Sequence, residues 1–209
     1  MNVRPVSPTA LVDLLADRIA DAAGDSWVRV AIDGAPAAHP DDLADALAGP
    51  LRLRGREVLR VSAGDFLRPA SLRFEAGRTD PDAYYGDWLD HGGLAREVLG
   101  PLDPGGTGKV LPSLWDTTTD RATRAPYVTL PPGGVLLLSG ALLLGHWLPF
   151  EVTAHLWMSP AALSRRTPPE WRWTLPAFAR YEEEVAPADT ADLVVRMDDP
   201  RHPAVVTHS

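Results

Sequence analysis

The stretch VRVAIDGAPAAHPDDLADAL, residues 28–47, decides the fold of this chain. Its first five residues are apolar and β-branched apart from Arg29, which predicts a short buried strand. Gly34 then opens a turn, and residues 41–47 carry apolar side chains at helical spacing. A strand, a glycine turn and a helix in this order form the setting in which phosphate-binding loops occur.

The turn has the outline of such a loop, the Walker A motif, whose pattern is G-x-x-x-x-G-K-[ST]. Aligned from Gly34, the second glycine is His39, the lysine is Pro40 and the hydroxyl residue is Asp41. The loop works by pointing backbone N–H groups at phosphates, but neither Pro36 nor Pro40 has one. Carboxylates at 41 and 42 repel a phosphate by about 1 kcal/mol in water and by more near a protein surface. The alternative is an ordinary strand, turn and helix that was never related to nucleotides.

Composition indicates one globular domain, or one domain with a small lid. The chain is 45% hydrophobic and 23% charged, and its net charge of −8 disfavours a nucleic-acid partner. The absence of cysteine excludes disulfides and thiolate metal sites and agrees with a cytoplasmic location. The longest apolar run, residues 135–144, is too short to span a bilayer, so we expect no membrane partner. The histidines show no ligand spacing and predict no metal site, while a homo-oligomer stays open.

Lys109 is the only lysine, so a phosphate-binding lysine could come from nowhere else. It ends the segment GGTGK, residues 105–109, which superficially looks like a phosphate loop. Val110 stands where Ser or Thr is needed, and no strand precedes the glycines. We therefore interpret the segment as a surface turn between prolines.

Strands and helices alternate along the chain. Strands are predicted at 28–32, 57–62, 135–138, 151–158 and 191–197, and helices at 9–23, 41–47, 83–99, 159–166 and 177–184. The helix over 83–99 is expected to break at Gly92 and Gly93, and residues 100–134 to form a functional loop or a small β element. The alternation predicts a three-layer α/β fold with a mainly parallel sheet of about five strands flanked by helices.

The chain resembles the uridine kinase and phosphoribulokinase family of P-loop kinases, especially the divergent uridine-kinase-like proteins of actinobacteria. The matching stretches are VRVAIDG (28–34), VSAGDFLRPASLRFEAGRTDPDAYYGDW (61–88), EVLGPLDPGG (97–106), LPSLWDTTTDRATRAPY (111–127), PPGGVLLLSGALLL (131–144), residues 159–166 and ADLVVRMDDP (191–200). The resemblance implies a P-loop NTPase-like fold with a small lid. It implies one domain over 1–209, with an N-terminal helix at 1–26, an acceptor-side insertion at 66–134 and a lid-like region at 160–176.

The resemblance also assigns roles, and three of the reactive positions have changed. The family's phosphate loop falls on Gly34, His39, Pro40 and Asp41, without its lysine. The catalytic aspartate falls on Gly64, so that Asp65 is the nearest candidate base. The acid that helps to hold Mg²⁺ falls on Ser139. Phosphoryl transfer depends on positioning and charge neutralisation, so the resemblance implies that little activity remains.

The acceptor side, by contrast, retains residues that suit a nucleoside. They are Phe66, Arg68, Arg73, Tyr84, Tyr85, Trp115, Asp116, Arg121 and Arg124. Aromatic rings can stack on a base, and Asp or Arg can hold a ribose or a phosphate. Several of these residues have a plainer interpretation: Tyr84, Tyr85 and Trp88 also suit helix packing.

The lid offers a similar choice. Its arginines resemble Arg165 and Arg166, which also suit a solvated helix end. Trp171 and Trp173 either pack beneath the lid or form an interface.

Three hypotheses follow. The first is a uridine-kinase-like protein that keeps a nucleoside or nucleotide cleft, has lost most phosphoryl transfer and needs no cofactor. The second is an active nucleoside kinase, a phosphotransferase using MgATP, with Asp65 as base and an arginine in place of the lysine. The third is an interaction protein whose vestigial cleft is filled by residues 36–40 and the tryptophans. The conformation of residues 34–42 distinguishes them: a ring of inward N–H groups or a closed turn.

Overall fold

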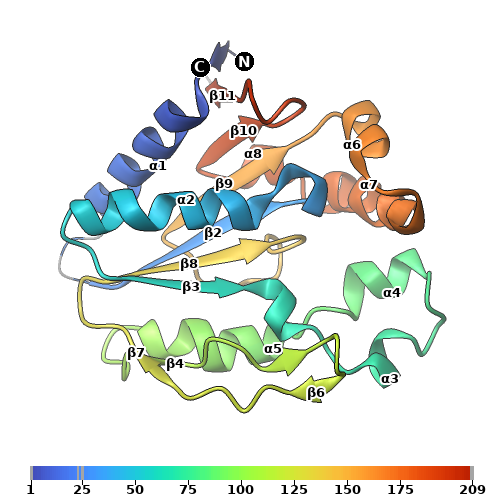
Figure 1. Cartoon of the computed structure of the whole chain (residues 1–209), viewed down its shortest axis with the longest axis horizontal. Coiled ribbons are helices and arrows are strands. Elements are labelled where there is room, and N and C mark those ends of the chain that lie inside the picture. The colour runs from blue at the N-terminus through green and yellow to red at the C-terminus, as the bar shows by residue number, and fades with distance from the viewer. Residues whose placement is uncertain (1, 23, 25, 208–209) are drawn as a thin grey trace.

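A seven-stranded sheet forms the middle layer of the computed structural model, which describes residues 2–22, 24 and 26–207 (Figure 1). In spatial order the strands are β1 (Asn2–Pro5), β11 (Ala204–Thr207), β10 (Leu193–Arg196), β9 (Val152–Trp157), β2 (Val28–Gly34), β8 (Val135–Gly140) and β3 (Val58–Ser62). The five strands from β10 to β3 are parallel, whereas β11 is antiparallel to β10 and β1 is antiparallel to β11.

The predicted five strands are therefore the five parallel ones, and the expected size of the sheet was too small by two. The missing strands, β1 and β11, are four residues each, too short for a readable alternation of apolar and polar residues. They pair because the two ends of the chain meet beside β10, which no local pattern reveals.

Helices cover both faces of the sheet and so give the predicted three layers (Figure 1). Helices α1 (Pro8–Ala22) and α2 (Pro40–Leu53) pack on one face, and α5 (His91–Leu94), its π-helical extension Ala95–Leu99 and α7 (Leu175–Glu184) pack on the other. The remaining helices are α3 (Ala70–Arg73), α4 (Pro81–Gly86), α6 (Pro160–Arg166) and α8 (Pro187–Thr190). Short 3-10 segments lie at Pro36–Ala38, Ala63–Phe66, Gly100–Leu102 and Pro169–Thr174.

Strand β8 shows why this layering follows from the sequence. Val135 and Leu137 face the α1–α2 core, and Leu136 and Leu138 face the opposite core. Successive side chains of a strand point to opposite faces, so an unbroken apolar run belongs to a strand that is covered on both sides.

The helix predicted over 83–99 breaks earlier than expected. The break lies at residues 87–90, and Gly92 and Gly93 belong to α5. The Asp90 carboxylate caps α5 by accepting a hydrogen bond from the Gly93 N–H at 2.8 Å. A Cβ at Gly93 would lie 2.7 Å from that carboxylate, so the glycine permits the cap and does not end the helix.

Residues 100–134 contain the expected small β elements. Strand β4 (Lys109–Val110) pairs with β7 (Val128–Thr129), and β5 (Trp115–Asp116) pairs with β6 (Arg121–Ala122). Lys109 is exposed on β4, away from any phosphate-like loop. Within the described residues, no helix combines the length and apolar character needed to cross a bilayer.

Candidate functional site

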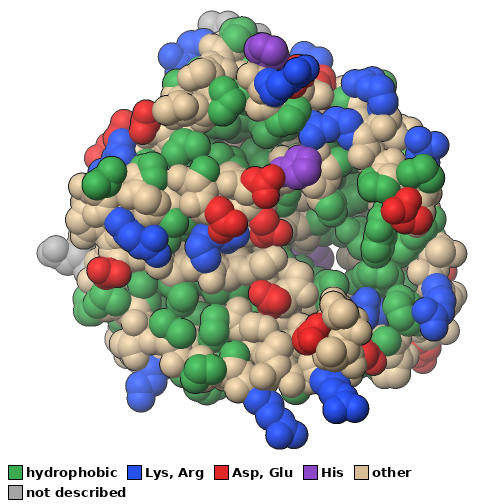
Figure 2. Space-filling model, viewed as in Figure 1, with side chains coloured by type: hydrophobic (Ala, Val, Ile, Leu, Met, Phe, Trp, Pro, Cys, Tyr) green, Lys and Arg blue, Asp and Glu red, His purple; other side chains and the backbone are tan. Residues whose placement is uncertain are grey.

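A cleft of about 570 Å³ opens at the carboxyl ends of the parallel strands. This edge of an open α/β sheet is where such folds bind ligands, because the loops that follow neighbouring strands converge there. The cleft is bounded by the loops after β2, β3 and β8, by α4 and by the segment from α6 to α7. Figure 2 shows the hollow between a group of acidic side chains and a mainly hydrophobic rim.

One side of the cleft is the turn over residues 34–42, which we call the loop wall. Gly34 begins it, and a Cβ there would lie 2.8 Å from the Leu156 Cβ, so only glycine fits against β9. Pro36–Ala38 then form a single 3-10 turn, in which the Ala38 N–H donates to the Ala35 carbonyl at 2.8 Å. The loop wall is a closed turn stiffened by proline.

Two of the N–H donors of this turn, those of Ala38 and His39, are used inside it. The His39 N–H donates to the Pro36 carbonyl at 3.0 Å, and His39 itself adopts a left-handed conformation with φ 57°. Pro36 and Pro40 have no N–H to offer. A phosphate-binding loop needs several N–H groups that converge on one point, and neither the two engaged N–H groups nor the two prolines of this turn supply one.

A polar cluster lies beside the start of α2. The Ser139 hydroxyl at the end of β8 donates a hydrogen bond to the Asp41 carboxylate. Arg60 of β3 donates to the Ser139 hydroxyl at 2.9 Å and to Asp45 at 2.7 Å, and lies 3.6 Å from Asp41. Asp41 and Ser139 are the two positions at which the family resemblance puts Mg²⁺ ligands. Here they contact each other, and a guanidinium supplies the positive charge.

The opposite side of the cleft, which we call the aromatic wall, consists of Tyr84, Trp88, Trp171 and Phe178. The ring centroids of Tyr84 and Trp88 are 5.1 Å apart, those of Tyr84 and Phe178 are 5.9 Å apart, and those of Trp88 and Trp171 are 6.3 Å apart, all edge to face. Trp173 packs behind them against Tyr84 and Trp88.

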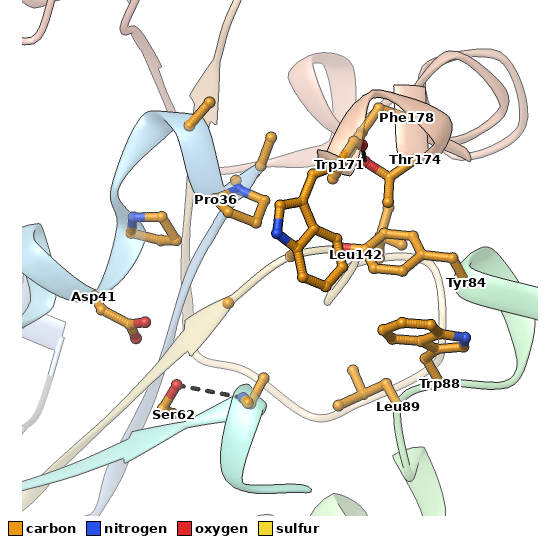
Figure 3. A pocket seen from close by; sticks show the side chains of 18 of the residues that line it. Pro36, Asp41, Ser62, Tyr84, Trp88, Leu89, Leu142, Trp171, Thr174 and Phe178 are labelled. Atoms are coloured by element: carbon orange, nitrogen blue, oxygen red, sulfur yellow. Dashed lines mark hydrogen bonds between the residues drawn. The ribbon is translucent and has the colours of Figure 1, made fainter. Parts of the chain in front are cut away.

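Two members of this wall differ in exposure. Trp88 is 5% exposed, whereas Trp171 is 45% exposed and projects into the cleft toward Pro36 and Leu142 (Figure 3). Burial raises the pKa of the Tyr84 hydroxyl to about 12, so the ring is neutral at physiological pH. Trp88 and Tyr84 thus pack in the core and also line the cleft. Of the two tryptophans in the lid segment, Trp171 lines the cleft and Trp173 does not.

A buried polar network supports the floor of the cleft. Asp33, at the end of β2, accepts hydrogen bonds from His155 Nδ1 at 2.6 Å, the Tyr181 hydroxyl at 3.1 Å and the Leu143 N–H at 2.9 Å. His155 Nε2 lies 3.7 Å from a carboxylate oxygen of Glu182. Burial opposes the charge on His155, but these two carboxylates outweigh it and raise its pKa to about 9. The network joins β2, β9, α7 and the loop after β8.

A stacked pair of histidines, His91 and His146, lies near this network, and its pKa values shift in the opposite direction from that of His155. The rings of His91 and His146 stack with centroids 3.7 Å apart, and His91 lines the cleft. Burial and the neighbouring ring lower the pKa of His91 to about 4, and burial lowers that of His146. Over residues 2–22, 24 and 26–207, no three His, Asp or Glu side chains gather in a way that could hold a metal ion.

The structure brings together only part of the predicted site. Gly34, His39, Pro40, Asp41, Tyr84, Tyr85 and Arg166 line the cleft. Asp65 does not, although its neighbour Gly64 does. Burial, with Asp41 and Asp116 nearby, raises the pKa of the Asp65 carboxyl.

The other acceptor-side residues lie outside the cleft. Phe66 is fully buried in the core, and Arg73 is buried with its guanidinium 5.1 Å from the Trp88 ring. Arg68 is half-buried, and the lid residue Arg165 is exposed. Trp115, Asp116, Arg121 and Arg124 belong to the β5–β6 hairpin region. Asp116 accepts hydrogen bonds from Thr118 and Thr119 within its own turn.

Sequence reasoning missed Arg60 and the network around Asp33. The available signals were single polar residues inside apolar strands: Arg60 in EVLRVS, Asp33 in VAIDG and His155 in TAHLW. A charge in a buried strand must be paired, but the sequence does not show with which partner.

Comparison with solved structures identifies the fold. The chain superposes on a possible uridine kinase from Bacillus stearothermophilus with a TM-score of 0.72 and 20% identity, covering 89% of this chain and 97% of the other. It matches a putative fructose transport system kinase from Silicibacter sp. TM1040 with a TM-score of 0.63 and 22% identity, covering 88% and 98%. The YGR205w protein matches with a TM-score of 0.58 and 9% identity, covering 97% and 100%.

The sequence alone finds no such relative. No family model matches the chain. No curated protein matches it either. The structural likenesses show that this chain has the α/β fold of uridine-kinase-like P-loop kinases.

Proposed function

We propose that this protein is a uridine-kinase-like binding protein that holds a small molecule in its cleft and has lost, or nearly lost, phosphoryl transfer from MgATP. The observation that carries the proposal is the closed loop wall. Its Ala38 and His39 N–H groups donate within the turn, and Pro36 and Pro40 have none. A triphosphate would find few free donors there and would meet the carboxylates of Asp41 and Asp42.

The residues that would hold Mg²⁺ do not fit the ion either. Asp41 is hydrogen-bonded to Ser139, and Arg60 already supplies a positive charge beside them. A cation entering this cluster would have to displace the guanidinium or break the Asp41–Ser139 hydrogen bond. Removing one transition-state donor commonly costs 10²–10³ in rate, so the combined changes leave little turnover.

The cleft nevertheless remains open, which supports ligand binding over a purely vestigial cleft. Its volume of about 570 Å³ lies within the range of small-molecule sites. Trp171 and Pro36 line it without filling it. The faces of Tyr84 and Trp171 suit a flat ring system, and a nucleoside is the candidate that the family resemblance supplies.

One observation favours the active-kinase alternative. The raised pKa of Asp65 is the direction expected of a general base tuned toward neutral pH. Against it, Asp65 does not line the cleft, and its pKa is raised first by burial and then by carboxylates that include Asp41, which also opposes a phosphate. If this alternative were correct, Asp65→Asn would abolish a measurable kinase activity.

Calorimetric titration with uridine, cytidine and adenosine, and separately with MgATP, tests the proposal. We expect saturable binding of at least one nucleoside, no saturable MgATP binding at millimolar concentration, and no ADP release when both are present. Trp171→Ala should weaken nucleoside binding. Trp147→Ala is the matched control, because Trp147 is fully exposed and does not line the cleft. Tight MgATP binding with sustained phosphorylation of uridine would overturn the proposal.

A further inference from the structure

We propose that the cleft selects a flat, apolar ligand that carries a positive charge, such as an aromatic amine, over an anionic or phosphorylated one. This inference rests on the proposed binding function and adds the sign of the ligand's charge. Its basis is the juxtaposition of an acidic edge and an aromatic wall across a single cavity.

The acidic edge is formed by Asp41 and Asp42 of the loop wall, both of which line the cleft. The Asp42 side chain is 80% exposed, and its ion-pair contact is His39 Nδ1 at 3.4 Å, a partner that is charged only when protonated. The carboxylates of Asp65 and Asp116 add to the negative charge nearby. Arg60 lies 3.6 Å from Asp41 and partly neutralises it, so Asp42 is the lining carboxylate that has no arginine or lysine ion pair among the described residues.

Positive charge in the lining is scarce by comparison. Among the lining residues that the structure describes, Arg166 is the one arginine, and no lysine is present. The Arg166 guanidinium donates to the Met197 carbonyl at 3.0 Å, which tethers it at the end of β10. An anionic ligand would thus meet the Asp42 carboxylate, the Asp41 carboxylate with Arg60 beside it, and one lining arginine that is already engaged.

The aromatic wall suits a cation as well as a flat ring. The face of an aromatic ring carries negative charge density, and tryptophan attracts cations most strongly. The protein already uses this interaction beside the cleft: Arg73 lies 5.1 Å from the Trp88 ring centroid and Arg180 lies 4.4 Å from that of Tyr85. Trp171 has no such cation among the described residues and offers its ring to the cleft.

Figure 3 shows that Asp41 and Trp171 reach toward the cleft from different sides. A ligand whose ring system lies against Tyr84 and Trp171 can direct an ammonium group toward Asp41 and Asp42. Both contacts favour the same charge, so the preference does not depend on either wall alone.

Three naphthalenes of matched size test the sign of the charge: 1-naphthylmethylamine, 1-naphthalenemethanol and 1-naphthoate, titrated at pH 7 and low salt. We expect the amine to bind about tenfold tighter than the alcohol and the carboxylate to bind most weakly. The advantage of the amine should shrink at high salt, because salt screens exposed charges.

Two variant pairs separate the contributions. Asp42→Asn should reduce the advantage of the amine over the alcohol severalfold and leave alcohol binding unchanged. Asp21→Asn, an exposed carboxylate on α1, should change neither. Trp171→Ala should weaken both ligands, whereas Trp147→Ala should weaken neither.

The outcomes distinguish this inference from the proposed function. Equal or tighter binding of the alcohol or the carboxylate overturns the cation preference and leaves the binding function intact. Failure of all three naphthalenes to bind also overturns the inference. MgATP-dependent phosphorylation of a nucleoside would instead overturn the proposed function, whatever the naphthalenes do.

Discussion

The loop wall and the aromatic wall face one cleft, yet hydrogen bonds hold the first together and ring packing holds the second. In the loop wall, the Ala38 and His39 N–H groups donate to the Ala35 and Pro36 carbonyls. The Asp41 carboxylate accepts a hydrogen bond from Ser139 at the end of β8. In the aromatic wall, the rings pack edge to face, and Tyr84 and Trp171 line the cavity. The cavity depends on packing, whereas a phosphate site depends on free donors, so the two walls can change independently of each other.

The largest expected effect tests whether the aromatic wall is part of the core. Trp88→Ala should reduce the free energy of unfolding by about 3–5 kcal/mol, because a buried ring in contact with several others is removed. Trp171→Ala should cost about 1 kcal/mol or less, since this ring is half exposed. Urea unfolding monitored by far-ultraviolet circular dichroism gives both values. If the two substitutions reduced the free energy of unfolding equally, Trp88 would not be more deeply buried than Trp171.

The second effect concerns the network beneath both walls. His155 is protonated in the folded state with a pKa of about 9, against about 6.5 in the unfolded chain. Its stabilising contribution is complete below about pH 6.5 and is lost as the pH rises through about 9. The loss is roughly 3 kcal/mol, at about 1.4 kcal/mol per pKa unit.

Urea titrations at pH 6, 7.5 and 9.5 measure this dependence. The groups that face His155 are Asp33 from β2 and Tyr181 and Glu182 from α7. Burial and Asp33 raise the pKa of Tyr181, so it does not titrate in this range. His155→Gln should be less stable at pH 6 and should lose most of the slope. A wild-type protein that gains stability between pH 7 and 9 would contradict the assignment.

The third effect tests whether Arg60 holds the loop wall in place. Arg60→Leu should cost about 1–2 kcal/mol, because Ser139 loses a donor and Asp41 loses its nearby cation. Arg52→Leu is the matched control, since Arg52 is exposed and makes only a long contact to the Val58 carbonyl at 3.4 Å. Even with Arg60 removed, MgATP should not bind, because the prolines still lack N–H groups. Binding of MgATP by Arg60→Leu would show that the guanidinium alone excludes the nucleotide.

The smallest expected effect concerns Trp147, an exposed tryptophan outside the aromatic wall. Trp147 is 100% exposed, so Trp147→Ala should change the free energy of unfolding by no more than about 0.5 kcal/mol. Thermal melts of this variant should therefore overlay those of the wild-type protein within about 2 °C. A larger shift would indicate that Trp147 is covered in solution, for instance by a second copy of the chain.

Much of the layering could be predicted from local patterns. The parallel strands each show an apolar run, and α6 begins where Ser159 caps it with a hydrogen bond to the Ala162 N–H at 3.3 Å. Residues 83–99 were harder, because glycines usually mark a break and here Gly93 serves the cap made by Asp90. The terminal strands were missed because a four-residue strand gains its stability only from its partner.

The candidate site divides in the same way. That Pro36 and Pro40 offer no N–H in this turn was predictable, since a missing N–H is a property of the residue. That Trp115 and Asp116 lie outside the cleft could not be predicted, because a family resemblance orders segments along the chain and does not show which way a hairpin faces. Arg60 and Asp33 were missed because their partners lie far away in the sequence.

The amino-acid sequence by itself determined the alternation of strands and helices and the chemical character of the turn over residues 34–42, because both depend on neighbours a few positions apart. Only the tertiary structure decided that His155 and Tyr181 meet Asp33, that Arg60 meets Ser139, and that Trp171 faces the loop wall across an open cavity. These contacts join residues 79–148 positions apart. Burying the rings stabilises the fold, whereas a buried charge is tolerated only when it is paired, and no local pattern shows its partner.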